Sequence, residues 1–274
     1  MVANYTVAKD VEAAIKSSGA KQMVFLTDFF GAAKQKVKVE AEQGKMMVDV
    51  AKANGIEYLV FLSVADLEPM LAFRLGKRVS APGVPVGFSR FVLTIHHMQV
   101  HHFVAKGEVE QHLKASGLRH SILRPVAFFE NYDDPANYNP LKRGSLKFLT
   151  LDPCFMVGTY DVGKAAAAML SDKEKWNGKT LTCTSWKGTL KEAAAALEAV
   201  SGTKTVGSLA MPKFARSCFL SDLDAMCVFF EDGYPGTQCS VEAFKAVVPD
   251  ALDAEGWFRY YGRFADGTPI AKAA

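Results

Sequence analysis

Short apolar runs alternate with amphipathic stretches over the first half of the chain. The runs at residues 23–28, 58–64 and 120–125 are bounded by polar residues, which is the pattern of buried strands. The stretches at 10–19, 39–55 and 105–116 carry apolar residues at helical spacing, and Gly19, Gly55 and Gly117 end them. Asp10 is the predicted N-cap of the first helix. Alternating strands and helices predict a parallel sheet with helices on both faces.

The second half of the chain is richer in helical patterns. Residues 161–170 predict a helix with Asp161 as its N-cap, and residues 179–185 predict a strand. Thr189 and Glu192 form a capping box that opens an alanine-rich helix ending near Gly202. We therefore predict an α/β fold with a parallel sheet in residues 1–160. Residues 161–274 are predicted to form a smaller, mostly helical lobe interleaved with that core.

Composition narrows the function classes. The net charge of +3 in 274 residues gives no reason to predict nucleic-acid binding. No apolar run is long enough to span a bilayer, so we predict no membrane association. The five cysteines are odd in number and include no CxxC pair, which favours reduced thiols and a cytoplasmic protein without a cysteine-bound metal.

Candidate chemistry lies where the predicted strands end, because ligands of open parallel sheets bind outside the carboxyl ends of the strands. The helix bearing Lys106 should begin on the same side, with His102 four residues earlier. A lysine at a helix start opposes the helix dipole, which favours contact with a ligand over the alternative of a solvated side chain. His102 is either a loop histidine at the surface or a catalytic group. His96, His97, His101 and His102 do not lead us to predict a metal site.

Several segments resemble the NmrA-like family of atypical short-chain dehydrogenases/reductases. They are "VFLTDFF", "EAEQGK", "YLVFLSVAD", "HHFVAKGEVEQHLKASGLRHSILRPVAFFENY" and "DVGKAAAAML". The resemblance implies a Rossmann fold and a cofactor, NADP or NAD. It implies catalytic roles for Lys106 and His102, and cofactor contacts from Thr27, Phe29, Gln43, Ser63, Val64, Lys106, Pro125, Phe128 and Asn131. For Phe29 the alternative is a core residue.

The chain departs from that family at its start. The sequence contains no GxxGxxG turn, which carries the cofactor pyrophosphate on a helix N-terminus. We expect the first βαβα, roughly 50 residues, to be missing. Its loss would leave residues 23–28 as an exposed apolar edge strand and would weaken cofactor binding. The choice between NAD and NADP is made in that part of the fold and stays open.

A second departure is the segment from Val79 to Gln99, "VSAPGVPVGFSRFVLTIHHMQ". The family joins the two flanking motifs by a shorter loop, and a loop this long is unusual in a compact domain. We predict that residues 79–99 are an insert, with a retained intron as the hypothesis for its origin. Sequencing the transcript tests this hypothesis.

The function that the resemblance implies has two forms. One is a redox sensor or regulator that binds a protein partner, and the other is an NAD(P)H-dependent reductase of a carbonyl or quinone. His102 stands where tyrosine–lysine reductases have a tyrosine, and a neighbouring cation disfavours imidazolium, which weakens the case for ordinary carbonyl reduction. The alternatives are a truncated gene-model fragment and a non-catalytic interaction domain without a cofactor.

Overall fold

A parallel sheet forms the centre of the first part of the chain. Its strands are β1 (Gln22–Leu26), β2 (Tyr58–Leu62), β3 (His120–Pro125) and β8 (Thr180–Cys183), in the order β1-β2-β3-β8. The β1–β2 and β2–β3 pairs are parallel, with Leu26 beside Leu62 and Leu62 beside Leu123. The predicted Rossmann-like α/β fold is confirmed, and β1 lies at the end of the sheet as expected for residues 23–28.

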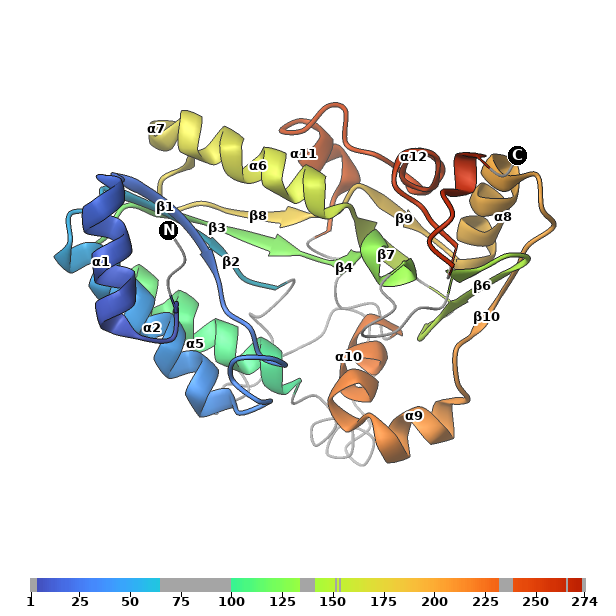
Figure 1. Ribbon diagram of the computed structural model, residues 1–274, viewed down its shortest axis with the longest axis horizontal. Coiled ribbons are helices and arrows are strands. Elements are labelled where there is room, and N and C mark those ends of the chain that lie inside the picture. The colour runs from blue at the N-terminus through green and yellow to red at the C-terminus, as the bar shows by residue number, and fades with distance from the viewer. Residues whose placement is uncertain are drawn as a thin grey trace, which may run out of the picture. The chain divides into compact units, whose positions relative to one another are not determined.

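Helices cover both faces of this sheet (Figure 1). On one face lie α1 (Ala8–Ser18), α2 (Val37–Ala53) and α5 (His101–Ala115), and α7 (Lys173–Trp176) lies on the other. A buried cluster joins the first face to its helices through side chains such as Ile15, Val48, Leu113, Phe25 and Phe61. The helical periodicity seen in the sequence therefore marks the residues that pack on the sheet.

Gly44 sets the distance between α2 and α5. A Cβ atom at this position would lie 2.3 Å from Cγ2 of Val109 and 3.0 Å from Cγ2 of Thr27. Both neighbours are buried, and Val109 is β-branched with little freedom to move aside. The glycine costs helix propensity but permits this close contact.

Two predicted helix caps are wrong. α1 begins at Ala8 with Val7 as its N-cap, so Asp10 lies inside the first turn. α6 (Thr159–Ser171) also begins two residues before the predicted cap, Asp161. The Asp161 carboxylate instead accepts hydrogen bonds from the Leu252 N–H at 2.9 Å and from Lys164 Nζ at 3.2 Å.

The later part of the chain contains two small three-stranded sheets and several helices. Its sheets have the orders β4-β7-β9 and β10-β6-β5. The capping box of Thr189 and Glu192 at the start of α8 is confirmed. The elements are β4 (Ala127–Phe128), η1 (Phe129–Tyr132), β5 (Leu141–Lys142), β6 (Ser145–Phe148), β7 (Cys154–Val157), β9 (Trp186–Gly188), α8 (Leu190–Ser201), β10 (Val206–Leu209), α9 (Lys213–Phe219), α10 (Ser221–Glu231), α11 (Val241–Lys245), α12 (Ala254–Tyr260) and η3 (Ile270–Lys272).

The chain divides into two compact units. The first comprises Met1–Arg124 and Ala165–Leu181, and the second comprises Pro125–Lys164 and Thr182–Ala274. The computed structural model describes residues 4–64, 100–133, 141–150, 152, 154–231, 239–264 and 266–272, so the predicted insert at 79–99 lies outside the described residues. The division at residue 160 stays a prediction. None of the helices in those described ranges is long and apolar enough to cross a membrane.

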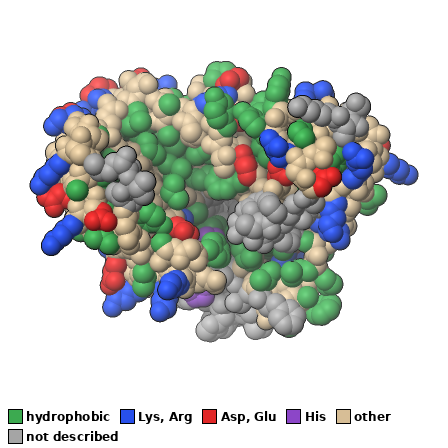
Figure 2. All heavy atoms as spheres, in the orientation of Figure 1, with side chains coloured by type: hydrophobic (Ala, Val, Ile, Leu, Met, Phe, Trp, Pro, Cys, Tyr) green, Lys and Arg blue, Asp and Glu red, His purple; other side chains and the backbone are tan. Residues whose placement is uncertain are grey.

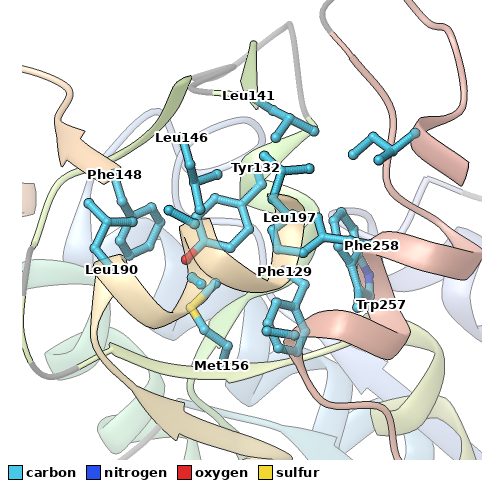
Figure 3. Close-up of a cluster of buried hydrophobic side chains, with 14 of the residues drawn as sticks. Phe129, Tyr132, Leu141, Leu146, Phe148, Met156, Leu190, Leu197, Trp257 and Phe258 are labelled. Carbon is cyan, nitrogen blue, oxygen red and sulfur yellow. The ribbon is translucent and has the colours of Figure 1, made fainter. Parts of the chain in front are cut away.

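Tyr132 carries a polar atom into the core of the second unit. Its ring packs with those of Phe129, Phe148 and Phe258, and the side chain is fully buried (Figure 3). Its hydroxyl has no hydrogen-bond partner among the described residues. Burial raises the pKa of the Tyr132 phenol well above its ordinary value, so the hydroxyl stays protonated.

We expect Tyr132→Phe to raise the free energy of unfolding by about 1–2 kcal/mol. The substitution keeps the ring and removes a buried polar group that lacks a partner, whose burial costs about 1–3 kcal/mol. Urea unfolding of both proteins measures the difference. Tyr260→Phe, at a position with 71% exposure, is the matched control and should change stability by less than about 0.5 kcal/mol. A clear loss of stability in Tyr132→Phe would show that the hydroxyl is bonded.

Candidate functional site

The carboxyl edge of the parallel sheet gathers polar residues in the first unit. Thr27 directly follows β1 and Ser63 directly follows β2, and both are buried. They are neighbours because Leu26 and Leu62, the preceding residues, are paired in the sheet. α5 begins at His101, so His102 and Lys106 lie one turn apart near its start, as the predicted shared face requires.

The Lys106 ammonium donates three hydrogen bonds, all to protein groups. It donates to the Thr27 carbonyl oxygen at 2.8 Å, to Thr27 Oγ1 at 2.8 Å and to Glu40 Oε1 at 2.7 Å. Only 11% of the Lys106 side chain is exposed. The alternative of a solvated lysine is therefore wrong, and Lys106 joins the end of β1 to α2 and α5.

Glu40 is the partner that the sequence did not reveal. Its side chain is fully buried, and Oε1 accepts a second hydrogen bond from Thr27 Oγ1 at 2.6 Å. A carboxylate taken out of water needs a cation and further hydrogen bonds to offset the loss of hydration. The helical spacing could have indicated that Glu40 is buried, because Glu40 lies on the same helical face as Gly44, Met47 and Ala51, which are buried.

Three further polar atoms in this region are buried without a hydrogen-bond partner among the described residues. They are Glu40 Oε2, Gln43 Oε1 and Ser63 Oγ. Buried polar atoms are nearly always satisfied in folded proteins, so such atoms mark places where a ligand donor can bind. Two are oxygens that only accept, and the serine hydroxyl can also accept, so the set suits the hydroxyl or amide groups of a ligand.

His102 packs in an aromatic cluster. Its ring centroid lies 5.7 Å from that of Phe29, 5.6 Å from that of Phe30 and 4.7 Å from that of Phe103. His102 and Phe29 are buried, whereas Phe30 is half exposed. The alternative of a surface loop histidine is therefore wrong, and the catalytic role of His102 stays a prediction.

Tyr5 is a second residue that sequence reasoning missed. It precedes α1 and is partly exposed. Burial and the charges of Asp28 and Glu40 raise the pKa of its phenol. The phenol of Tyr5 therefore stays protonated at neutral pH. No motif connects Tyr5 to these residues, because more than twenty positions separate them in the sequence.

The remaining predicted site residues divide between the units. Gln43 lies on α2, and Val64 is half-buried two residues beyond β2. Pro125, Phe128 and Asn131 belong to the second unit, at the end of β3, on β4 and in η1. Their contact with a cofactor stays a prediction. No group of three or more potential ligands for a metal occurs among the residues that the structure describes, which exclude His96 and His97.

Comparison with known proteins shows which family this chain matches. The model of the NmrA-like family matches residues 87–258. A nucleoside-diphosphate-sugar epimerase from Staphylococcus aureus superposes with a TM-score of 0.66 at 16% identity, over 93% of this chain and 81% of that one. A similar structure is NmrA, a negative transcriptional regulator in complex with NAD, with a TM-score of 0.64 at 18% identity, over 93% and 77% of the two chains.

A third similar structure is an NADPH-dependent quinone oxidoreductase from Escherichia coli complexed with NADPH. Its TM-score is 0.62 at 18% identity, over 92% of this chain and 80% of that one. At these identities the three structures show a shared fold, while activity must be argued from the site. The family model matches more than half of the chain, so this protein belongs to the NmrA-like family.

Proposed function

We propose that this protein binds NAD(P)(H) at the carboxyl edge of its sheet and acts as a redox sensor. The observation that carries the proposal is the Lys106 ammonium, whose three hydrogen bonds go to Thr27 and Glu40. In a tyrosine–lysine reductase the lysine cation lowers the pKa of a phenol that donates a proton. Here the residue one turn before Lys106 is a histidine packed among phenylalanines, which favours cofactor binding without efficient carbonyl reduction.

The buried acceptors suit one end of a dinucleotide. Glu40 Oε2 and Ser63 Oγ would accept hydrogen bonds from ribose hydroxyl or carboxamide groups, and Lys106 would hold Glu40 in place. The nicotinamide, when bound, supplies hydride chemistry. The pyrophosphate end lacks the GxxGxxG turn, and each charge-assisted hydrogen bond lost there is worth about 1.5–3 kcal/mol. We therefore expect weak binding, and the choice between NADP and NAD stays open.

The structural neighbours support both forms of the proposal. NmrA, the regulator, was solved with NAD, and the quinone oxidoreductase was solved with NADPH. A regulator predicts that a protein partner binds this chain in a cofactor-dependent way. Pull-down of a tagged chain with NADPH or NADP⁺ present measures that dependence.

A reductase of a carbonyl or quinone is the second candidate function, and the similarity to the quinone oxidoreductase solved with NADPH favours it. Burial and two carboxylates raise the pKa of the Tyr5 phenol, so this phenol is not activated as a proton donor. A reductase predicts NADPH oxidation that requires a quinone or carbonyl acceptor.

Calorimetric titration with NADPH, NADP⁺, NADH and NAD⁺ tests the cofactor proposal. Lys106→Met keeps the apolar stem and should raise the dissociation constant at least about tenfold, which is about 1.4 kcal/mol. His102→Ala should leave the dissociation constant nearly unchanged. Lys45→Met is the control, because Lys45 makes a partly exposed ion pair with Glu108 on α5. Circular dichroism establishes that each variant is folded.

Three results would contradict parts of this proposal. The absence of binding at millimolar cofactor would leave a non-catalytic interaction domain, and micromolar NADPH binding would show that the missing turn matters little. Loss of a robust reductase activity in His102→Ala would make histidine the acid and favour the reductase. His102→Tyr, which restores the tyrosine–lysine pair, should raise any measurable carbonyl reduction.

A further inference from the structure

The β5-β6-β10 sheet of the second unit has one covered face and one open face. Leu141, Leu146 and Phe148 point to the covered face, where they pack in a buried cluster with side chains of α8. Side chains alternate along a strand, and residues paired across strands share a face. The register therefore places a different set of residues on the open face, namely Lys142, Ser145, Lys147, Val206 and Ser208.

Three lysines make the open face cationic. Lys142 and Lys147 stand on it, and Lys204 precedes β10 by two residues. The Lys204 main chain adjoins the β5–β6 turn, since a Cβ on Gly144 would lie 3.3 Å from its carbonyl oxygen. Within the described ranges none of these lysines forms an ion pair, and the face itself carries no acidic residue. Figure 2 shows Lys and Arg side chains on the part of the surface where Figure 1 draws β6 and β10.

The neighbouring cation Arg143 is different, because it already has partners in the second unit. Its guanidinium carbon lies 4.8 Å from the centroid of the Phe264 ring. The pKa of Asp266 is lowered by hydrogen bonds from Thr268 and also by the charge of Arg143. The unpaired positive charge of this region therefore belongs to the lysines of the open face.

We propose that this lysine face, formed by Lys142, Lys147 and Lys204, binds an extended acidic segment of a partner protein. Lys142 pairs with Ser145 on the adjacent strand, and Lys147 lies two residues further along that strand. Strand geometry separates the Cα atoms of the two lysines by roughly 8 Å. An extended peptide presents every second side chain at a spacing of roughly 7 Å. Carboxylates that alternate along such a peptide therefore match the spacing of the lysines.

The other side chains of the face favour a peptide over other anionic partners. Ser145 and Ser208 carry hydroxyls that can donate hydrogen bonds to carboxylates. The face has no aromatic side chain on which a nucleic-acid base could stack, and Val206 is its only apolar residue. A single valine is also too little apolar surface for membrane insertion.

The lysine face is independent of the proposed cofactor site, because its residues all lie in the second unit and Lys106 and Glu40 lie in the first. A redox sensor needs a docking surface for its partner, and this face would supply one. Binding of an acidic peptide to the full chain without a cofactor therefore tests the face alone.

Fluorescence anisotropy with a fluorescein-labelled peptide of alternating glutamate and valine tests the proposal. The wild type should bind this peptide and should not bind the same peptide with glutamine in place of glutamate. Raising the salt concentration should weaken the binding, because the contact is ionic and exposed. The double variant Lys142→Glu, Lys147→Glu should raise the dissociation constant by about tenfold or more, because it places like charges against the peptide.

The matched control is the double variant Lys9→Glu, Lys179→Glu. Both lysines are exposed residues of the first unit, and the variant changes the net charge by the same amount. It should bind the glutamate peptide as the wild type does. Equal losses in the two double variants would show that only net charge matters and would overturn the proposal. Tighter binding of a thymidine oligonucleotide or of phosphatidylserine vesicles than of the peptide would also overturn it.

Lysine acetylation of the wild type locates the contact without any substitution. The glutamate peptide should protect Lys142, Lys147 and Lys204 from acetylation and leave Lys9 and Lys179 unprotected, as mass spectrometry would show. Lys142→Gln, Lys147→Gln replaces the charge-reversed variant should that variant fail to fold. A wild type that does not bind the glutamate peptide, or peptide binding that leaves the three lysines unprotected, contradicts the assignment.

Discussion

Glu40→Ala is expected to lower the free energy of unfolding by about 3–5 kcal/mol, the usual cost of removing one partner from a buried ion pair. Without the carboxylate, the Lys106 ammonium stays in a region where only 11% of its side chain meets solvent. Thr27 Oγ1 loses its acceptor at the same time. The cost is large because a buried charge without a counter-charge is poorly solvated. Urea denaturation followed by circular dichroism measures it.

Glu42→Ala is the matched control for this experiment. Glu42 lies two residues further along α2, where its side chain is 64% exposed and faces Lys38 at 3.8 Å. Its removal should cost less than about 1 kcal/mol, as for most exposed ion pairs. Lys106→Met combined with Glu40→Leu removes both charges and should recover much of the loss. Equal stabilities for Glu40→Ala and Glu42→Ala would show that the Glu40–Lys106 pair does not hold these elements together.

Glu110→Ala is the second substitution with a large expected effect, again a loss of about 3–5 kcal/mol. Arg124 at the end of β3 donates two hydrogen bonds to the Glu110 carboxylate on α5, Nε to Oε1 at 3.0 Å and Nη2 to Oε2 at 2.7 Å. The exposed fractions of the two side chains are 4% and 1%. This bidentate geometry fits the guanidinium fork, and alanine would leave the guanidinium buried without it. Differential scanning calorimetry reports the change.

Glu108→Ala is the control for Glu110→Ala, because it removes a charged partner on the same helix that is less buried. Glu108 lies on the same helix and pairs with Lys45 at 2.9 Å, but its side chain is 28% exposed. We expect a loss below about 1 kcal/mol. The double variant Glu110→Leu, Arg124→Met should be closer to the wild type than Glu110→Ala. A double variant that is as unstable as the single one would contradict the interpretation.

Periodicity in the sequence was enough to predict the sheet and its helices. The predicted strand segments became β1, β2 and β3, and the helical stretches became α1, α2 and α5. This succeeds because both patterns are local: each residue's face follows from its own neighbours. Helix starts were less certain, as Asp10 and Asp161 show, because an acidic residue in the first turn resembles a cap in sequence.

The site was predicted in part. Topology placed Thr27, Ser63 and Lys106 at one edge of the sheet, where the structure has them. Glu40 was not predicted, because its cation lies 66 residues away and a glutamate on a helix ordinarily faces solvent. Tyr5 was missed for a similar reason, since only the fold brings it near Asp28 and Glu40.

The last strand of the first sheet, β8, is far from β3 in the sequence, and this separation affects folding during synthesis on the ribosome. β3 is complete at Pro125, but its outer neighbour β8 begins at Thr180. At about 5–20 residues per second, the ribosome needs roughly 3–11 seconds to synthesise the segment between them. Throughout that interval the nascent sheet has one open edge at β3, a strand that is fully buried in the folded protein, and this edge is available to strands of neighbouring nascent chains. Translation speed between codons 125 and 180 therefore sets how long the growing chain is exposed to misassembly.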